Sequence, residues 1–307
     1  MENLLTSEGL HEAWLEADKL RQLEKALQSE IIVLTETKTA LTENVREVED
    51  QRRKLTVLRR DLSGQKSVLD QTRKEQATLL SQTKNKESEY QKLLNEKQQA
   101  KLDFEQELRD FETALEFTLD PSTIPSPGSG TLRFPLDPDY MVRCKDKQSA
   151  YKNIYCISQY FGNTEFAQSG AYSGKGHNGI DFGTPQGTKV VAALTGAVQA
   201  TGNTDLYPKC YSYGKWVLVR HANGLSTLYA HLSVTSVATG DTVPAGGLIG
   251  YSGKTGYATG PHLHFTVYAS SGVQLVKLGD IKSKTNCANA TVPVAPTEAY
   301  LNPVQYL

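Results

Sequence analysis

Residues 260–268 read GPHLHFTVY, and this stretch decides how the C-terminal part of the chain folds. Successive side chains of a β-strand point to opposite faces, so His262 and His264 share one face while Leu263 points to the core. Branched and aromatic side chains follow up to Tyr268, as is typical of a strand. The stretch therefore predicts a strand that directs two imidazoles toward one point.

Three more β-rich runs precede this strand, at residues 189–193, 216–220 and 225–229. Glycine turns separate the runs, and no helix-length segment with helical periodicity interrupts them. This pattern predicts an all-β, mainly antiparallel domain over residues 132–307.

The N-terminal part of the chain has a different pattern. An apolar residue recurs every seven positions through eight consecutive repeats, the spacing that keeps one seam of a helix facing a partner. The complementary seam contains Ile31 and Val45 but also four basic residues, which indicates loose or asymmetric packing. A second apolar face with helical spacing lies between Tyr90 and Leu115. Residues 1–120 are therefore predicted to form a long helical coiled coil. The seam positions are Leu20, Leu27, Leu34, Leu41, Val48, Leu55, Leu62 and Leu69, and the basic residues are Lys38, Arg52, Arg59 and Lys66.

Gly64 lies between the two helical patterns and is a candidate for a hairpin or a break. A glycine inside a helix costs only about 1 kcal/mol, so the sequence leaves a continuous helix equally open. Residues 121–131 contain three prolines and two glycines, which end the helical region and predict a linker. The predicted fold class is thus α + β in separate units: a coiled coil, a linker and a β domain.

The two parts of the chain differ in charge. Residues 1–120 contain 19 Lys+Arg and 25 Asp+Glu, for a net charge of −6, whereas residues 121–307 contain 14 and 9, for +5. The positive charge of the β domain could favour an anionic matrix such as a cell wall. It is too dilute to predict binding of nucleic acid.

All four cysteines lie in the predicted β domain, and none forms a CxxC pair. An even set of this kind favours disulfides in an oxidising compartment over a cysteine zinc site. Three pairings of Cys144, Cys156, Cys210 and Cys287 are open. The chain shows no signal peptide and no membrane span, although a removed signal would leave the same picture.

Histidine and aspartate residues in glycine-flanked segments predict a metal site. His177 and Asp181 are four residues apart, and we expect Gly179 between them to allow a tight bend that brings both side chains together. Imidazole nitrogen and carboxylate oxygen suit Zn²⁺, and a catalytic zinc needs three protein ligands and an open position. The remaining histidines are then available for proton chemistry. His221 precedes a turn without a partner motif and is interpreted as structural.

The order of these motifs resembles the LytM-type, or M23, family of zinc endopeptidases, which cut bacterial peptidoglycan. The resemblance extends from residue 158 to residue 303. It implies that His177, Asp181 and His264 bind Zn²⁺, and that His231 and His262 are the two catalytic histidines that do not bind the metal. It does not decide which of the two is the base. The matching segments are SQYFG at 158–162, HNGID at 177–181, PQGT at 185–188, YAHL at 229–232, GKTG at 253–256, GPHLHF at 260–265 and YLNP at 300–303.

Two places depart from the family pattern: residues 163–164, where an arginine is often found nearby, and a loop at 205–213 that looks inserted. Neither touches a motif residue, so both put substrate specificity in doubt rather than chemistry. The coiled coil ahead of the domain resembles that of EnvC-like division factors, whose peptidase domain is typically degenerate. This chain retains the full residue set.

The resemblance thus predicts a zinc metalloendopeptidase that hydrolyses cross-links or stem peptides of peptidoglycan, with the coiled coil acting in regulation or localisation. The alternative is a non-catalytic activator of murein hydrolases in cell division. Besides peptidoglycan, a membrane complex or a coiled-coil protein is an expected partner. The expected location is periplasmic, extracellular or cell-wall associated. The bond that is cut and the oligomeric state stay open.

Overall fold

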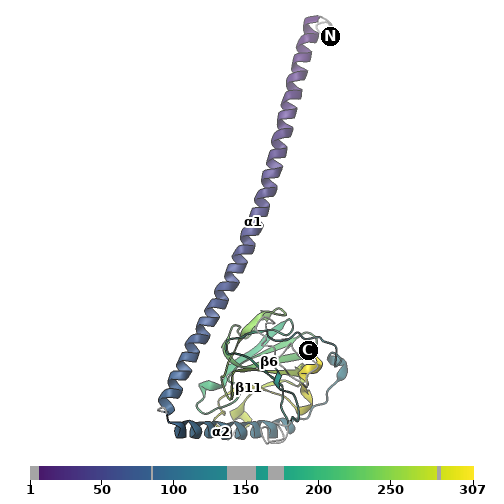
Figure 1. Cartoon of the computed structure of the whole chain (residues 1–307). Coiled ribbons are helices and arrows are strands. Elements are labelled where there is room, and N and C mark those ends of the chain that lie inside the picture. The colour runs from purple at the N-terminus through teal and green to yellow at the C-terminus, as the bar shows by residue number, and fades with distance from the viewer. Residues whose placement is uncertain (1–6, 84–85, 137–156, 165–175, 282–284) are drawn as a thin grey trace. The chain divides into compact units, whose positions relative to one another are not determined.

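The structure, a computed structural model, describes residues 7–83, 86–136, 157–164, 176–281 and 285–307. The chain divides into two compact units, residues 1–62 and 63–307. Helices precede a mainly antiparallel β domain, which confirms the predicted fold class (Figure 1). The predicted domain ranges, 1–120, 121–131 and 132–307, stay predictions. None of the described helices is long and apolar enough to cross a membrane.

Two α-helices, twelve strands and six short 3₁₀ helices make up the regular structure of the described residues. The helices are α1 (Ser7–Thr83) and α2 (Glu87–Thr113). The strands are β1 (Ile157–Gln159), β2 (Ile180–Gly183), β3 (Lys189–Val191), β4 (Gly196–Asn203), β5 (Lys215–His221), β6 (Leu225–Thr235), β7 (Thr242–Val243), β8 (Leu248–Ser252), β9 (His262–Ala269), β10 (Gln274–Lys277), β11 (Thr291–Val294) and β12 (Tyr300–Leu301).

The first unit contains the N-terminal part of α1, and its leucine seam lies open to solvent. Leu34 is 73% exposed and Leu20 is 66% exposed. Such large apolar side chains normally leave water when a partner helix is available. The long helix agrees with the predicted coiled coil.

Of the two alternatives that the sequence left open at Gly64, the structure has the continuous helix, because α1 continues through this residue to Thr83. Gly64 lies in the second unit, where it is buried against the ring of Tyr251, and a Cβ atom at this position would collide with that ring. Gly64 therefore does not end the helix. It allows the helix to approach the sheet closely. The helical region is interrupted later: the Lys86 N–H donates to the Thr83 carbonyl oxygen, and α2 begins at Glu87.

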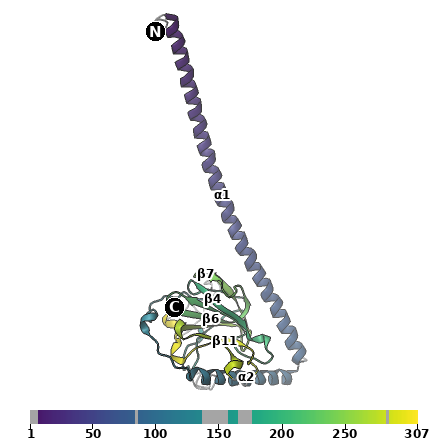
Figure 2. The ribbon, with the colours of Figure 1, turned by 180° about the vertical axis from the view of Figure 1, so that it is seen from behind.

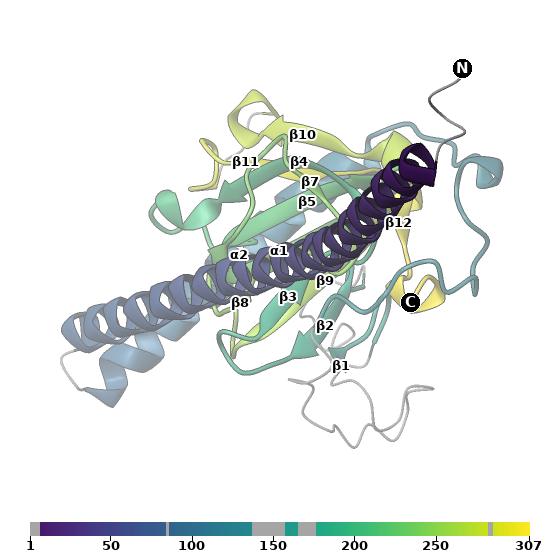
Figure 3. The same ribbon diagram turned by 90° about the horizontal axis from the view of Figure 1, so that it is seen from above.

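The main sheet is antiparallel throughout its described pairs, with the strand order β1-β2-β9-β6-β5-β4-β7. Strand β12 also pairs with β9, and β8 connects β3 with β6. A separate hairpin is formed by β10 and β11. Figure 3 shows β2 and β9 side by side. Strand β9 is thus central, which explains why its sequence GPHLHFTVY has so much influence on the fold.

Helix α2 is packed against the β domain. Phe104 and Leu108 are almost fully buried in the same apolar core as the sheet, and burial of such side chains stabilises by about 1.5–3 kcal/mol each. Glu112 Oε1 accepts hydrogen bonds from the Tyr300 hydroxyl and from the Ala295 N–H, at 2.5 and 3.2 Å. Both side views show α2 lying along the domain near β11 (Figures 1 and 2).

The predicted linker also contacts the β domain. The Gly128 N–H donates to the Gln305 carbonyl oxygen at 2.6 Å. Just beyond the linker, the Leu132 N–H donates to the Tyr306 carbonyl oxygen at 2.8 Å. A disulfide joins Cys210 to Cys287, which is one of the pairings that the sequence left open. Cys144 and Cys156 lie outside the described residues.

Candidate metal and catalytic centre

Strand pairing brings His264 next to residues from two neighbouring strands. In β2, Asp181 pairs with His264 of β9, and on the other side Ala230 of β6 pairs with the same histidine. His177 lies just before β2, where its backbone exchanges two hydrogen bonds of 2.8 Å with Gly162. The sheet register therefore determines which side chains meet at the site.

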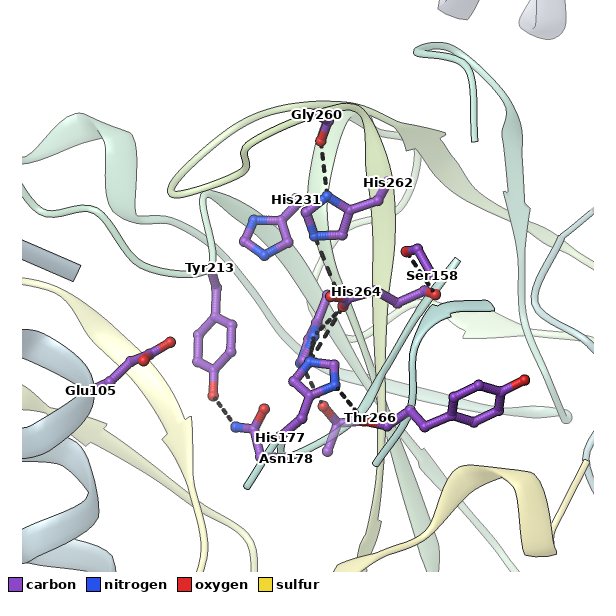
Figure 4. A network of polar contacts seen from close by, with 12 residues as sticks. Glu105, Ser158, His177, Asn178, Tyr213, His231, Gly260, His262, His264 and Thr266 are labelled. Carbon is purple, nitrogen blue, oxygen red and sulfur yellow. Dashed lines mark hydrogen bonds and ion pairs between the residues drawn. The ribbon is translucent and has the colours of Figure 1, made fainter. Parts of the chain in front are cut away.

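Three side-chain donors converge at this point. His177 Nε2 lies 3.1 Å from His264 Nδ1 and 3.4 Å from Asp181 Oδ1, and His264 Nδ1 lies 2.9 Å from that oxygen. All three residues are buried. Figure 4 shows the side chains of His177 and His264 close together. Zinc bonds of about 2.0–2.1 Å in a tetrahedral arrangement place neighbouring donors roughly 3.3 Å apart. Two nitrogens and one carboxylate oxygen at this spacing fit Zn²⁺.

Hydrogen bonds on the far side of the rings orient the two imidazoles. His177 Nδ1 lies 3.1 Å from the Tyr160 carbonyl oxygen, which can only accept, so this nitrogen is protonated and Nε2 is left with its lone pair. His264 Nε2 lies 2.9 Å from Thr266 Oγ1, which can accept from it and leave Nδ1 unprotonated. Both lone pairs then face Asp181, as a metal site requires.

The other two histidines are oriented in the same way. His231 Nδ1 lies 2.9 Å from the Thr255 carbonyl oxygen, and His262 Nδ1 lies 2.9 Å from that of Gly260. Each ring therefore has Nε2 unprotonated when the imidazole is neutral. The two ring centres are 4.6 Å apart, and His262 Nε2 is 3.8 Å from Asp181 Oδ1. This pair lies directly beside the three converging donors.

The backbone of His231 is unusual. Its φ of 58° lies in the left-handed region, which few residues other than glycine adopt. Strand β6 pairs with β9 up to Ala230 and with β8 from Leu232 onward, so His231 is the residue at which the partner strand changes. The irregular backbone turns its ring toward the site.

Burial determines the protonation of the site. Burial, aided by the neighbouring His262 and His264, holds the pKa of His231 well below its usual value. Burial also lowers the pKa of His264. Burial alone would raise the pKa of Asp181, but the adjacent His177 and His264 hold it well below its usual range. His231 is therefore neutral at neutral pH and Asp181 is ionised.

Gly179 lies in a bend between His177 and Asp181, as expected, and it also has a role that the sequence did not indicate. A Cβ atom at this position would collide with the carbonyl oxygen of Phe265 in β9. The glycine lets the chain between His177 and Asp181 approach β9 closely, and this approach places both side chains against His264. His221 lies away from the site and is buried between the Thr195 carbonyl oxygen and Thr227 Oγ1, in agreement with a structural role.

Sequence reasoning missed Tyr213 and Asn178. Tyr213 accepts the backbone N–H of His231 on its carbonyl oxygen at 2.9 Å, and Asn178 Nδ2 donates to its hydroxyl at 3.2 Å. Nothing in the sequence identified Tyr213, because it belongs to the loop that looked inserted. Thr266 could have been found, since it shares a strand face with His264 two residues before it.

The site opens into a cavity of about 650 Å³ that is lined by both the β domain and α2. Figure 4 shows Glu105 projecting from α2 toward Tyr213. The apolar helical face was predicted, but its position beside the site was not. The residues of α2 that line the cavity are Gln98, Lys101, Leu102, Phe104, Glu105, Leu108, Arg109, Glu112 and Thr113.

Residues 175–276, which contain all five of these histidine and aspartate residues, match the model of Peptidase family M23. The chain is 48% identical over 89 residues to the DD-carboxypeptidase/endopeptidase Mpg of Neisseria meningitidis, which is 29% of this chain and 19% of that protein. It is 44% identical over 89 residues to the peptidoglycan DD-endopeptidase ShyA of Vibrio cholerae, again 29% and 19%. The matched part thus spans about a fifth of these curated relatives.

Two further similarities concern a cell-division protein and a solved structure. The chain is 38% identical over 93 residues to the cell division protein DipM of Caulobacter vibrioides, covering 30% of this chain and 14% of that one. A zinc-containing peptidase from Vibrio cholerae is 29% identical, with a TM-score of 0.35, over 46% of this chain and 37% of the other.

Proposed function

We propose that this protein is a zinc-dependent endopeptidase that hydrolyses peptide cross-links or stem peptides of bacterial peptidoglycan. One observation carries the proposal: two imidazoles, whose Nδ1 atoms face backbone carbonyl oxygens, lie beside a buried His-Asp-His set whose spacing suits zinc. The M23 match and relatives that are named as peptidoglycan endopeptidases support the substrate class.

The five residues have distinct roles in this proposal. His177, Asp181 and His264 hold the metal, and a bound zinc supplies Lewis-acid activation of water and of the scissile carbonyl group. His231 and His262 transfer protons at their Nε2 atoms: one accepts the proton of the attacking water, and one protonates the leaving amine. Burial keeps His231 neutral and able to accept a proton.

The helical region would act in regulation or localisation. The exposed leucine seam of α1 suits a coiled-coil protein or a membrane complex as partner. The proposed location is periplasmic, extracellular or at the cell wall, and the disulfide between Cys210 and Cys287 supports an oxidising compartment. The alternative is a role as a non-catalytic activator in cell division. The similarity to the cell division protein DipM supports an involvement in cell division.

The decisive test measures zinc content and digestion of purified peptidoglycan for the whole chain. We expect one zinc per chain and released muropeptides, whose masses identify the bond that is cut. His264→Ala removes a ligand, so both the zinc and the products should be lost. His11→Ala is the matched control, because this exposed histidine lies on α1.

Two outcomes would contradict the proposal. A purified protein without stoichiometric zinc, together with unchanged digestion by His264→Ala, rules out the zinc enzyme. A protein that binds zinc and releases no muropeptides, but accelerates a separate amidase on the same peptidoglycan, supports the activator instead.

A further inference from the structure

The loop that looked inserted, residues 205–213, lies against a motif segment of the site. This segment, residues 253–257, contains the GKTG sequence. The Tyr257 N–H donates to the Ser212 carbonyl oxygen at 2.9 Å. A Cβ atom at Gly256, whose φ is 68°, would collide with the same carbonyl oxygen. The loop and the motif segment therefore fit closely against each other.

Asp205 forms a second polar contact between the loop and the motif segment. Its carboxylate accepts the Gly256 N–H, with Oδ1 2.9 Å and Oδ2 3.1 Å from the nitrogen. The Asp205 N–H donates to Asn203 Oδ1 at 3.0 Å, which orients the residue that carries the carboxylate. A charged acceptor binds an N–H more strongly than a neutral one does, so this contact holds the motif segment firmly.

The other edge of the same peptide group faces the catalytic histidine. The Thr255 carbonyl oxygen lies 2.9 Å from His231 Nδ1. This carbonyl group and the Gly256 N–H belong to one planar peptide unit, so the carboxylate of Asp205 and the ring of His231 contact opposite edges of that unit. Hydrogen bonds in such a chain polarise one another, and a carboxylate at one end makes the carbonyl oxygen at the other end a better acceptor.

The loop holds the backbone of His231 as well as its ring. The His231 N–H donates to the Tyr213 carbonyl oxygen at 2.9 Å. The disulfide between Cys210 and Cys287 fastens the loop to the C-terminal part of the domain. Asp205 lies at the surface, so its substitution leaves the core of the domain intact.

We propose that Asp205 is a positioning residue for His231 and acts through the peptide group between Thr255 and Gly256. The carboxylate holds and polarises this group, so the carbonyl oxygen keeps the imidazole proton on Nδ1 and leaves Nε2 available for proton transfer. The inference rests on the proposed function, in which His231 transfers a proton. It gives the loop a part in catalysis, where the sequence had suggested a part in substrate specificity.

The experiment uses the whole zinc-loaded chain and compares Asp205→Ala with Asp205→Asn. Alanine removes the acceptor of the Gly256 N–H, whereas asparagine keeps one oxygen and loses the charge. We expect kcat for a cross-linked peptide to fall about 3- to 30-fold in Asp205→Ala, with KM within about twofold and one zinc per chain. Asp205→Asn should be intermediate.

A spectroscopic measurement follows the ring of His231 itself. Imidazole nitrogen NMR shifts, assigned with the help of His231→Asn, should show a proton on Nδ1 of His231 in the wild type. Asp205→Ala should show a mixture of the two tautomers, because the Thr255 carbonyl group is then held less firmly.

Asp241→Ala is the matched control. Asp241 Oδ2 accepts the Ala238 N–H at 2.8 Å in a turn elsewhere in the domain, so this variant also removes an exposed aspartate that binds a backbone N–H. It should leave kcat and the His231 shifts unchanged, and unfolding midpoints show that each variant is folded.

Three results would overturn the inference: unchanged His231 shifts in Asp205→Ala, loss of zinc from that variant, or an equal loss of kcat in Asp241→Ala. Should Asp205→Ala not fold, Asp205→Asn decides alone, because shifts and kcat identical to those of the wild type would overturn the inference.

The proposed function fails separately. His231 shifts that change in Asp205→Ala, in a protein that binds zinc and releases no products, support the inference and contradict the endopeptidase. Hydrolysis by Asp205→Ala at the wild-type rate does the reverse.

Discussion

Backbone carbonyl groups determine what the histidine side chains of the site can do. The carbonyl oxygens of Tyr160, Thr255 and Gly260 each face a Nδ1 atom, so His177, His231 and His262 all have Nε2 available. In one ring this atom can bind a metal, and in two it can accept a proton. The same orientation thus serves two different chemistries. Of the three rings, His177 is the one that forms a group of mutually close donors with Asp181 and His264.

The difference between a ligand and a catalytic histidine can be tested at His231. His231→Asn removes the imidazole while keeping a residue that tolerates a φ of 58°. We expect kcat to fall about 100- to 10,000-fold, the usual contribution of a general acid or base, while zinc content stays at one per chain.

Metal analysis and hydrolysis of a cross-linked peptide check this expectation. Loss of zinc in His231→Asn would show that His231 is itself a ligand. Unchanged kcat would remove it from the proton-transfer step.

Much of the site could be predicted from residue spacing. Strand alternation placed His262 and His264 on one face, and the structure brings both close to Asp181. The carbonyl partners could not be predicted, because a backbone carbonyl has no sequence signature and its position depends on the fold. The close approach of Gly179 to Phe265 could not be predicted either, because Phe265 lies on another strand and is distant in the sequence.

At the scale of elements, helix α2 lines one side of the active-site cavity. Its amphipathic spacing predicted one apolar face, and Phe104 and Leu108 on that face are buried. The sequence did not indicate that the β domain would cover this face, because helical periodicity shows which side is buried and not what buries it. Glu112 is buried on the same helix, and its carboxylate is held by the Tyr300 hydroxyl.

Glu112 should make stability depend on pH. Burial raises its pKa from 4.5 to about 7, so the folded protein holds this proton more tightly than the unfolded chain. The free energy of unfolding should therefore fall as pH rises from about 4.5 to about 7, by an amount on the order of 3 kcal/mol, and then stay level.

Glu112→Gln keeps an Oε1 acceptor for Tyr300 and Ala295 without the charge. It should match the wild type near pH 5 and exceed its stability by about 2–3 kcal/mol near pH 8. Urea unfolding of both zinc-loaded proteins at each pH measures this difference, and any pH dependence of zinc binding cancels between them. A difference that does not change with pH would mean that Glu112 stays ionised in the folded protein.

At the scale of the whole molecule, the leucine seam of α1 is an apolar surface that lies open to solvent. Leu27 and Leu41 are 55% and 62% exposed on a continuous helix. The heptad spacing predicted this helix correctly. It could not predict that the helix passes through Gly64, because the collision that makes a glycine necessary involves Tyr251, which is distant in the sequence.

Variants can distinguish association through the leucine seam from association through exposed apolar residues in general. The triple change Leu27→Gln, Leu34→Gln and Leu41→Gln removes three seam positions, and we expect it to abolish concentration-dependent association and lower the melting temperature of the helix. The control changes Ile32, Val33 and Val57 to glutamine, because these exposed apolar residues lie off the seam.

Analytical ultracentrifugation and circular dichroism of the whole chain measure both effects. Equal effects of the two triple variants would argue against a specific seam. A wild-type chain that is monomeric at all concentrations would point to a different protein as the partner.

The leucine seam continues beyond the first unit. Gly64 lies against Tyr251 and Val68 is buried, so the β domain covers one side of α1. At about 100° per residue both lie on the side of the helix away from the seam. The seam itself stays open there, because Leu62 and Leu69 are 69% and 50% exposed. A partner helix can therefore follow the seam from Leu20 to Leu69, a length of roughly 75 Å at about 1.5 Å per residue, and a shorter partner would leave some of these leucines in water.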